Sequence, residues 1–202
     1  MSDHTAATDV PIHNTLAVRW SPYVFAPRPV PEHDLAAMFE AARWAPSSFN
    51  EQPRRYIVGV ADAADHDDTH ARILATLFEG NQIWARHAPV LALGIAVHTF
   101  AASGQTNKAA VHDLGLASAN LVVEATARGL SVHQMIGLDP VSAAEAFAVP
   151  DGAEVVTALA IGYADEHTDA APELRKRESK PRTRQSTDEF VFTGRYGRAA
   201  SL

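Results

Sequence analysis

Residues 42–53 read Ala42-Arg-Trp-Ala-Pro-Ser-Ser-Phe-Asn-Glu-Gln-Pro53, and this stretch carries more chemical information than any other part of the sequence. Its second half is a predicted loop that places two hydroxyl and two amide side chains between a pair of prolines. Such side chains, on a backbone stiffened by proline, present donors and acceptors to a flat heteroaromatic ring. They also form ordinary turns and helix caps, so the loop alone leaves both interpretations open.

The segments around this loop predict alternating helices and strands. Residues 32–44 place apolar side chains at helical spacing, and residues 55–60 form a short β-branched run typical of a strand. The continuous apolar run at 89–97 is typical of a central strand covered on both faces. Residues 109–128 predict the longest helix, which ends at a glycine. We further predict a strand, a short helix and a strand over residues 130–135, 141–147 and 155–163.

Length and composition indicate a single domain over residues 1–202. A chain of 202 residues with 47% apolar residues can bury one substantial core. Residues 1–13 are expected to be flexible. After residue 163 the sequence turns polar, so residues 164–202 are expected to form an extended C-terminal arm. Its end, at 189–192, resembles a short strand that pairs with its own sheet or with a partner's.

Composition also excludes several classes of site and function. The chain has no cysteine, which excludes disulfides, zinc-thiolate sites and a thiol nucleophile. The net charge of −7 argues against a nucleic-acid partner. The N-terminus lacks the basic start and apolar run of a secretory signal, and no later run is long enough to cross a bilayer. We therefore expect a cytoplasmic protein that acts on a small molecule, without a membrane or nucleic-acid partner.

Cationic side chains gather at two places that suit a small anionic ligand. Arg19 and Ser21 offer a bidentate cation and a neutral donor to a phosphate, although an Arg-x-Ser pattern also occurs by chance. Residues 175–184 hold six lysines or arginines. What matters for such a ligand is this local charge rather than the net charge of the chain.

Taken together, these segments resemble the nitroreductase family of FMN-dependent oxidoreductases over most of the chain. The specific match is the family signature Ala-Arg-x-Ala-Pro-Ser-x-x-Asn-x-Gln-Pro at residues 42–53. Weaker matches in the first half are the Arg-x-Ser element at 19–21, the Pro-Val-Pro helix start at 29–31, and Asn81 ahead of an Ala-Pro strand start at 88–89. In the second half they are the Gly-Leu helix end at 129–130, the turn at 137–139 and the Arg-x-Arg at 182–184.

The resemblance implies an α+β fold: a three-layer sandwich with a mixed central sheet flanked by helices, in an intertwined homodimer with each FMN at the subunit interface. The groups that would face the phosphate and ribityl chain are Arg19, Ser21, Arg182 and Lys180. The 45–53 loop of the other subunit would border the ring. Asn81 would hydrogen-bond the ring's polar edge, and the turn at 134–137 would place a backbone N–H near flavin N5. The implied FMN-binding set is Arg19, Trp20, Ser21, Tyr23, Pro46, Ser47, Ser48, Asn50, Asn81, Gln134, Met135, Ile136, Gly137, Arg182 and Arg184.

The implied function is hydride transfer from NAD(P)H through FMN to a nitroaromatic, quinone or enone by a ping-pong mechanism. Because the reactive atom belongs to FMN, no catalytic side chain is required. His133 is the one candidate for donating a proton to a reduced substrate. Three alternatives stay open: a flavin-binding or sequestering protein of the same fold without efficient turnover, a cofactor-free interaction protein, and a specialised reductase or ring-cleaving enzyme. The sequence does not decide among these alternatives, because it contains no nicotinamide-specific motif such as a glycine-rich dinucleotide loop.

Three features depart from the family pattern. Tyr23 stands where relatives carry a second cation, which puts one phosphate or ribityl contact in doubt. Trp84 replaces another cation, and its indole either stacks on a substrate or fills the dimer interface. The segment at 99–108 is short, which predicts an open active site.

Other clusters of polar residues suggest weaker hypotheses. His66 and His70 lie four residues apart, but no third ligand follows at a natural spacing, so we predict no metal site. His112 and Asp113 are adjacent, and neighbours on a helix point in different directions, so Asp113 is expected at the surface or an interface. The basic run at 175–177 is expected to be a solvated arm rather than a nucleic-acid patch.

Overall fold

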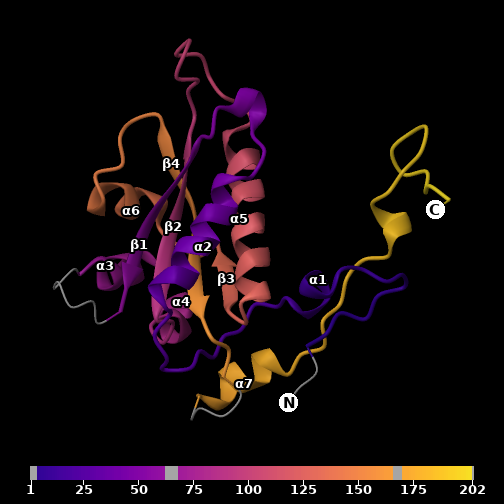
Figure 1. The fold of residues 1–202 in the computed structure, drawn as a ribbon, viewed down its shortest axis with the longest axis horizontal. Coiled ribbons are helices and arrows are strands. Elements are labelled where there is room, and N and C mark those ends of the chain that lie inside the picture. The colour runs from indigo at the N-terminus through magenta and orange to yellow at the C-terminus, as the bar shows by residue number, and fades with distance from the viewer. Residues whose placement is uncertain (1–3, 62–67, 166–169, 202) are drawn as a thin grey trace.

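The computed structural model describes residues 4–61, 68–165 and 170–201. Its centre is a four-stranded sheet with the strand order β1-β2-β4-β3 (Figure 1). All three strand pairs are antiparallel. The strands are β1 (Arg54–Val60), β2 (Val90–Val97), β3 (Ser131–Met135) and β4 (Ala153–Gly162).

The two central strands, β2 and β4, are buried on both faces along most of their length. Successive side chains of a strand point to opposite faces, so each strand divides its residues between two cores. In β2, Val90 and Ala92 join one apolar cluster, whereas Leu91 and Leu93 join the other. A continuous apolar strand therefore requires a layer of helices on each side.

Helices supply both of these layers. On one face, α2 (Glu32–Arg43) and α5 (Ala110–Ala127) lie side by side and pack against the sheet (Figure 1). On the other face, α3 (Thr69–Thr76), α4 (Glu79–Ala85) and α6 (Pro140–Ala146) cover the second core. Two short helices, α1 (Asn14–Val18) and α7 (Pro172–Glu178), belong to the terminal segments. The fold is thus a three-layer α+β sandwich, which confirms the predicted fold class.

The predicted helices and strands from residue 32 to residue 163 are all present, with bounds shifted by at most two residues. The expected mixed pairing is not found among the described strands, because each strand runs opposite to its neighbours in the sheet. Helices α1, α3 and α4 and the short 3₁₀ turn Ser48–Asn50 were not predicted. They are short, and a few residues carry too little periodicity to reveal a helix.

Within the single chain, the C-terminal segment differs from the prediction in two places, and pairing of residues 189–192 with a partner's sheet stays a prediction. Residues 172–178 form a helix rather than irregular chain, because Pro172 suits the first helical turn and Leu174 is buried in the second core. The expected terminal strand at 189–192 is absent from the described sheet. Phe192 instead pairs with Ala199 in an isolated bridge, since the chain folds back on itself through a turn.

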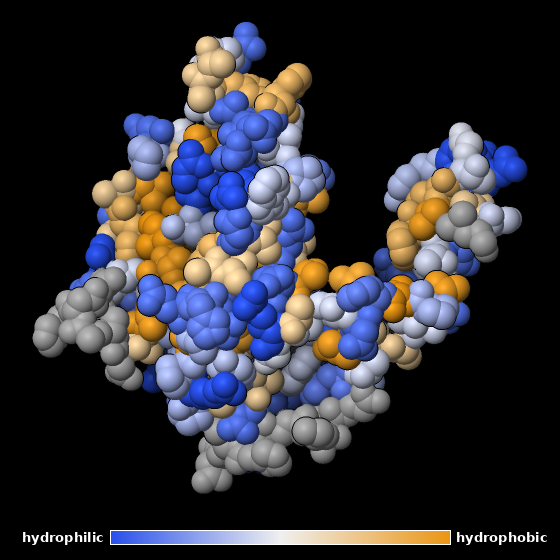
Figure 2. All heavy atoms as spheres, in the orientation of Figure 1, coloured by the Kyte–Doolittle hydropathy of each residue, from blue (hydrophilic) through white to orange (hydrophobic). Residues whose placement is uncertain are grey.

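The outer arm, residues 179–201, stands away from the sandwich (Figure 1). It contains a 3₁₀ turn, Thr187–Glu189, and ends in the small turn closed by Phe192. Figure 2 shows apolar atoms exposed along this arm. Phe190 is exposed, and the side chain of Tyr196 is 93% exposed. The described chain therefore leaves the apolar surface of its outer arm uncovered.

Candidate functional site

A groove of about 300 Å³ runs between α5, β3 and the segment that follows α1. Arg19 and Ser21 line it together with Gln134, which belongs to β3. The guanidinium of Arg19 donates a hydrogen bond to the hydroxyl oxygen of Ser21, 3.3 Å away. The remaining lining is apolar and comes from Leu16, Ala119, Val122, Val123 and Val132. The groove thus combines polar groups at one side with an apolar wall along the helix.

The Arg-x-Arg pair at 182–184 lies close to Arg19, although the two segments are far apart in sequence. Arg182 donates to the carbonyl oxygen of Ala17 at 2.9 Å and to that of His4. Burial lowers the pKa of Arg19, and the positive charges of Arg182 and Arg184 lower it further. Burial, followed by the charge of Arg184, also lowers the pKa of Arg182. These arginines repel one another, so an anion beside them would be stabilised.

A second part of the predicted site is the turn at the end of β3, residues 134–137, which is bonded to Asn81. The Asn81 side-chain amide donates to the carbonyl oxygen of Gly137 at 3.0 Å, and the Phe78 backbone N–H donates to the same oxygen at 3.0 Å. A Cβ on residue 137 would lie 2.4 Å from the Asn81 amide nitrogen, so any other residue there would displace the Asn81 side chain from its hydrogen bond. Beside it, Ile136 is 82% exposed. Asn81 therefore holds the turn in position.

Trp84 lies in the interior of its own subunit. Its side chain is fully buried, and its indole N–H donates to the side-chain oxygen of Asn81 at 3.3 Å. The rings of Tyr23 and His133 pack against it, with ring centroids 5.3 Å and 4.4 Å away. Because Trp84 is buried within the single chain, both expectations for it, substrate stacking and the filling of a dimer interface, are wrong. The indole that replaces a cation here extends the hydrophobic core.

Tyr23, at the position where a second cation was expected, packs its ring into this aromatic cluster and offers no charge. Its backbone N–H and that of Val24 both donate to one carboxylate oxygen of Glu178, each at 2.8 Å. Glu178 is the last residue of α7, immediately before the outer arm. This contact fixes the base of the segment that carries Arg182 and Arg184.

His133 is half-buried beneath the same rings. Its Nδ1 lies 2.8 Å from the carbonyl oxygen of Pro22. Because a carbonyl oxygen can only accept, Nδ1 carries the proton. Burial lowers the pKa of His133, which outweighs the opposite effect of this hydrogen bond. A neutral imidazole whose N–H is already donated is a poor proton donor, so its environment argues against the catalytic role considered for it.

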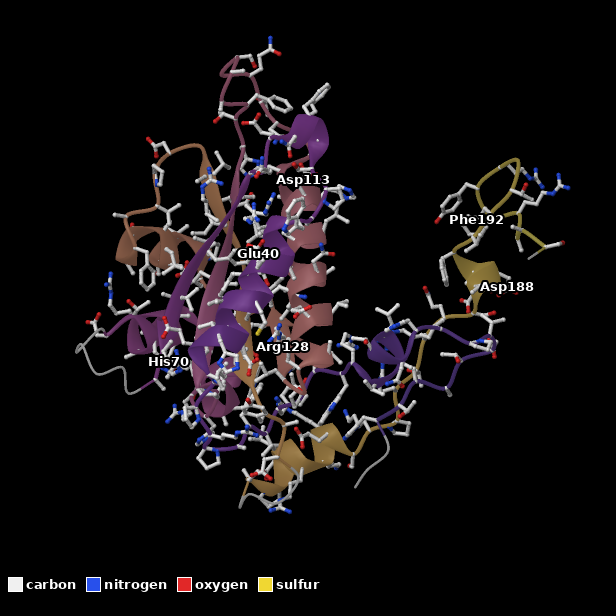
Figure 3. The ribbon with its side chains drawn as sticks, viewed as in Figure 1. Glu40, His70, Asp113, Arg128, Asp188 and Phe192 are labelled. Carbon is white, nitrogen blue, oxygen red and sulfur yellow. The ribbon has the colours of Figure 1, made fainter. Side chains whose placement is uncertain are left out.

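The 45–53 loop lies at the other end of α5 from Arg128 (Figure 3). Its Ser48 backbone N–H donates to a carboxylate oxygen of Asp113, 3.0 Å away, in the first turn of the helix. Val122, in the wall of the arginine groove, is nine residues further on, which is about 14 Å along a helix axis. Among the residues that the structure describes, none from this loop lines the groove.

Asp113 itself is not where it was expected. Its side chain is 2% exposed, so the prediction of a surface or interface position was wrong for the single chain. The sequence does hold a signal for this: Asp113 precedes Ala117 and Leu121 at intervals of four and therefore belongs to the buried stripe of the helix. Glu178 has no comparable signal, because its role depends on a contact across the fold.

The rival clusters form no site in the described parts of the chain. No group of three or more acidic or histidine side chains there could hold a metal ion. His66 lies outside the described residues, and the His70 ring bonds the carbonyl oxygen of Ala88. His112 is exposed beside the buried Asp113. None of the described helices has the length and apolar character needed to span a membrane.

Comparison with known proteins identifies the family. The family model described as the nitroreductase family matches residues 16–163. An uncharacterized 15.4 kDa protein of Mycolicibacterium smegmatis is 36% identical over 149 residues, which cover 71% of this chain and 97% of that protein. The chain belongs to the nitroreductase family. The matched range ends at Tyr163, so the place of Arg182 and Arg184 beside Arg19 comes from the structure.

Two further relatives extend this comparison. A solved structure described as an oxidoreductase containing FMN is 29% identical to this nitroreductase-family chain, with a TM-score of 0.88. The match covers 98% of this chain and 99% of that one. A Streptomyces coelicolor protein, provisionally named an NADH dehydrogenase/NAD(P)H nitroreductase, is 38% identical over 79 residues, 39% of this chain and 36% of that protein.

The buried His133 predicts a pH dependence of stability. Its pKa is lowered below 6.5 in the folded state, so the unfolded chain binds the proton more readily. The neutral His133 therefore contributes to the stability of the folded state in full above the ordinary histidine pKa, and this contribution is lost as the pH falls below that pKa. We expect His133→Gln to flatten the fall in the free energy of unfolding between about pH 7 and pH 5, measured by urea denaturation. His112→Gln, at an exposed position, is the control and should keep the wild-type slope; equal slopes for all three proteins would contradict the assignment.

Proposed function

We propose that the groove beside Arg19 holds the phosphate and ribityl chain of FMN, and that the protein works as an NAD(P)H-dependent FMN oxidoreductase. The protein is an oxidoreductase of the nitroreductase family, and one relative of similar length contains FMN. The convergence of Arg19, Arg182 and Arg184 is the observation that carries the proposal. Burial and neighbouring positive charge lower the pKa of Arg19 and of Arg182, and the three guanidinium groups together form a donor set suited to a phosphate dianion.

The other groups at this site suit the rest of the cofactor. Ser21 and Gln134 offer neutral donors and acceptors to hydroxyl groups. Val122 and Val132 give the groove an apolar wall that excludes water. The turn at 134–137, fixed by Asn81, presents backbone groups at a defined place at the end of β3. These residues bind and orient, and none of them needs to act as a nucleophile or base.

When bound, FMN supplies the atom that accepts hydride from NAD(P)H and returns the electrons to a nitroaromatic, quinone or enone in a ping-pong cycle. The protein's part is to leave room for donor and acceptor in turn. The exposed Ile136 and Phe78 lie at the turn and offer apolar contact to flat molecules.

We also infer that the site is completed by a second copy of the chain. One chain brings the arginines and the β3 turn together but leaves the 45–53 loop outside the groove. The outer arm exposes apolar side chains that a partner would cover, and Leu16 and Val123 are exposed along the groove. A homodimer in which the loop of each subunit borders the groove of the other accounts for both observations.

A spectrum of the purified protein separates catalysis from mere flavin binding. We expect a yellow protein that contains FMN and that bleaches anaerobically when NADH or NADPH is added, because reduction removes the visible absorption of the flavin. Reoxidation by a quinone or nitroaromatic should restore the colour. Colour without bleaching by either nicotinamide would support the sequestering alternative, and a colourless protein that FMN cannot reconstitute would exclude both.

Removal of one arginine tests the phosphate site. We expect Arg19→Ala or Arg182→Ala to weaken FMN binding by about 10- to 100-fold, since a hydrogen bond to a charged group contributes about 1.5–3 kcal/mol. Wild-type affinity should also fall as ionic strength rises. Arg72→Gln, which removes a cation from α3 on the other face of the sheet, should bind as the wild type does. Fluorescence titration of the apoprotein with FMN measures the affinity of each variant and of the wild type. Unaltered affinity in both Arg19→Ala and Arg182→Ala would refute the assignment.

Mixed dimers test whether each site is shared between two chains. We expect an Arg19→Ala/Arg182→Ala chain and a Ser47→Ala/Ser48→Ala/Asn50→Ala chain each to bind FMN weakly alone. In a mixed dimer one site combines the intact groove of one chain with the intact loop of the other. Refolding the two together should therefore restore tight binding of one FMN per mixed dimer, measured by titration after separation by affinity tags. No recovery would show that each chain binds FMN with its own loop.

A further inference from the structure

The 45–53 loop has a backbone that its own sequence does not favour. Phe49, Asn50 and Gln52 have φ angles of +53°, +57° and +54°. The left-handed region is uncommon for residues other than glycine, and it persists only where the surroundings fix it. Asparagine tolerates this conformation better than phenylalanine or glutamine does. Three such residues among four indicate a loop that is held from outside.

The hydrogen bonds within the 45–53 loop join residues that are close in sequence. The Asn50 N–H donates to the Ser47 carbonyl at 3.1 Å, and the Gln52 N–H donates to the Ser47 hydroxyl at 3.1 Å. From outside, the Glu51 carboxylate accepts the N–H of Ala101 at 2.7 Å in an exposed contact. The contact from α5 is different, because the Asp113 carboxylate that accepts the Ser48 N–H is buried.

The position of Asp113 directs its carboxylate at the loop. Asp113 lies in the first turn of α5, where the helix dipole stabilises an anion. It lies close enough to Arg54 for its charge to act on that guanidinium. Arg54 follows the loop, and it donates to the backbone carbonyl of Arg43, which precedes the loop. The buried carboxylate of Asp113 (Figure 3) therefore bonds the middle of the loop, while Arg54 links the segments on either side of it.

We propose that Asp113 is a positioning residue that fixes the 45–53 loop in the conformation it presents to FMN in the partner's groove. This inference rests on the proposed function. Phe49, at the tip of the loop, is 91% exposed and meets only the edge of Phe100 among its aromatic neighbours in the described chain. The loop thus projects outward, while the carboxylate that sets its shape stays inside its own subunit.

Two variants of Asp113 with a matched control test this role. Asp113→Asn keeps a neutral acceptor of nearly the same shape, and Asp113→Ala removes the acceptor. Glu124→Gln removes a carboxylate from the far end of the same helix, where Glu124 pairs with Arg128. The first measurement is amide hydrogen exchange of residues 47–52 in the apoprotein. The second is the FMN dissociation constant together with the visible circular dichroism of the bound flavin.

We expect exchange at Ser48 to be about tenfold faster in Asp113→Asn and faster still in Asp113→Ala, because charge-assisted hydrogen bonds are about twice as strong as neutral ones. FMN binding should weaken in the same order, by about tenfold for the asparagine variant. The dichroism band should change, since the ring would meet an altered loop. Thermal unfolding of Asp113→Asn should stay close to that of the wild type, and Glu124→Gln should match the wild type in exchange, affinity and dichroism.

The outcomes separate this proposal from the proposed function. A wild-type chain that binds no FMN would overturn both. A wild-type chain that binds FMN, with affinity and dichroism unchanged in Asp113→Asn, would overturn the positioning role alone. Faster exchange without any effect on the flavin would also overturn it, because Asp113 would then serve only the fold. If Asp113→Ala does not fold, the asparagine variant decides.

Discussion

The burial of β2 and β4 on both faces is the constraint on which the rest of the structure depends. Strands whose side chains are apolar on both sides must be covered twice, so helices are required above and below the sheet. This requirement places α5 against the sheet, with its apolar stripe inward. The two ends of α5 then organise the chemistry. The 45–53 loop is attached near its start, and the arginine groove follows its second half.

Positive charge beside the groove has an electrostatic cost. Arg19 is partly buried beside Arg182 and Arg184, and like charges in a region of reduced solvation destabilise one another. Glu178 fixes the segment that brings the second and third arginines there. In the proposed function, a phosphate bound beside these arginines would relieve the repulsion.

Some of this could be predicted from the sequence and some could not. The strands and long helices have strong periodicity, so their positions follow from local pattern. The motif at 42–53 indicates the family, because its combination of residues is specific. The helix at 172–178 could not be predicted, since it depends on burying Leu174 against a distant core. Nor could the interior place of Trp84, which follows from the packing of Tyr23 and His133 around it.

The 45–53 loop shows why such a site needs support from inside the chain. A left-handed backbone at three non-glycine residues is unfavourable, so a free loop would populate other conformations and pay to order itself when the ligand arrives. In the proposed homodimer, a contact made within one chain would remove that cost before the partner is present. In a site shared between two chains, each chain must deliver its part already shaped, because neither the flavin nor the other subunit contributes to the folding of the free monomer. A buried carboxylate on the longest described helix is a rigid place from which to do this.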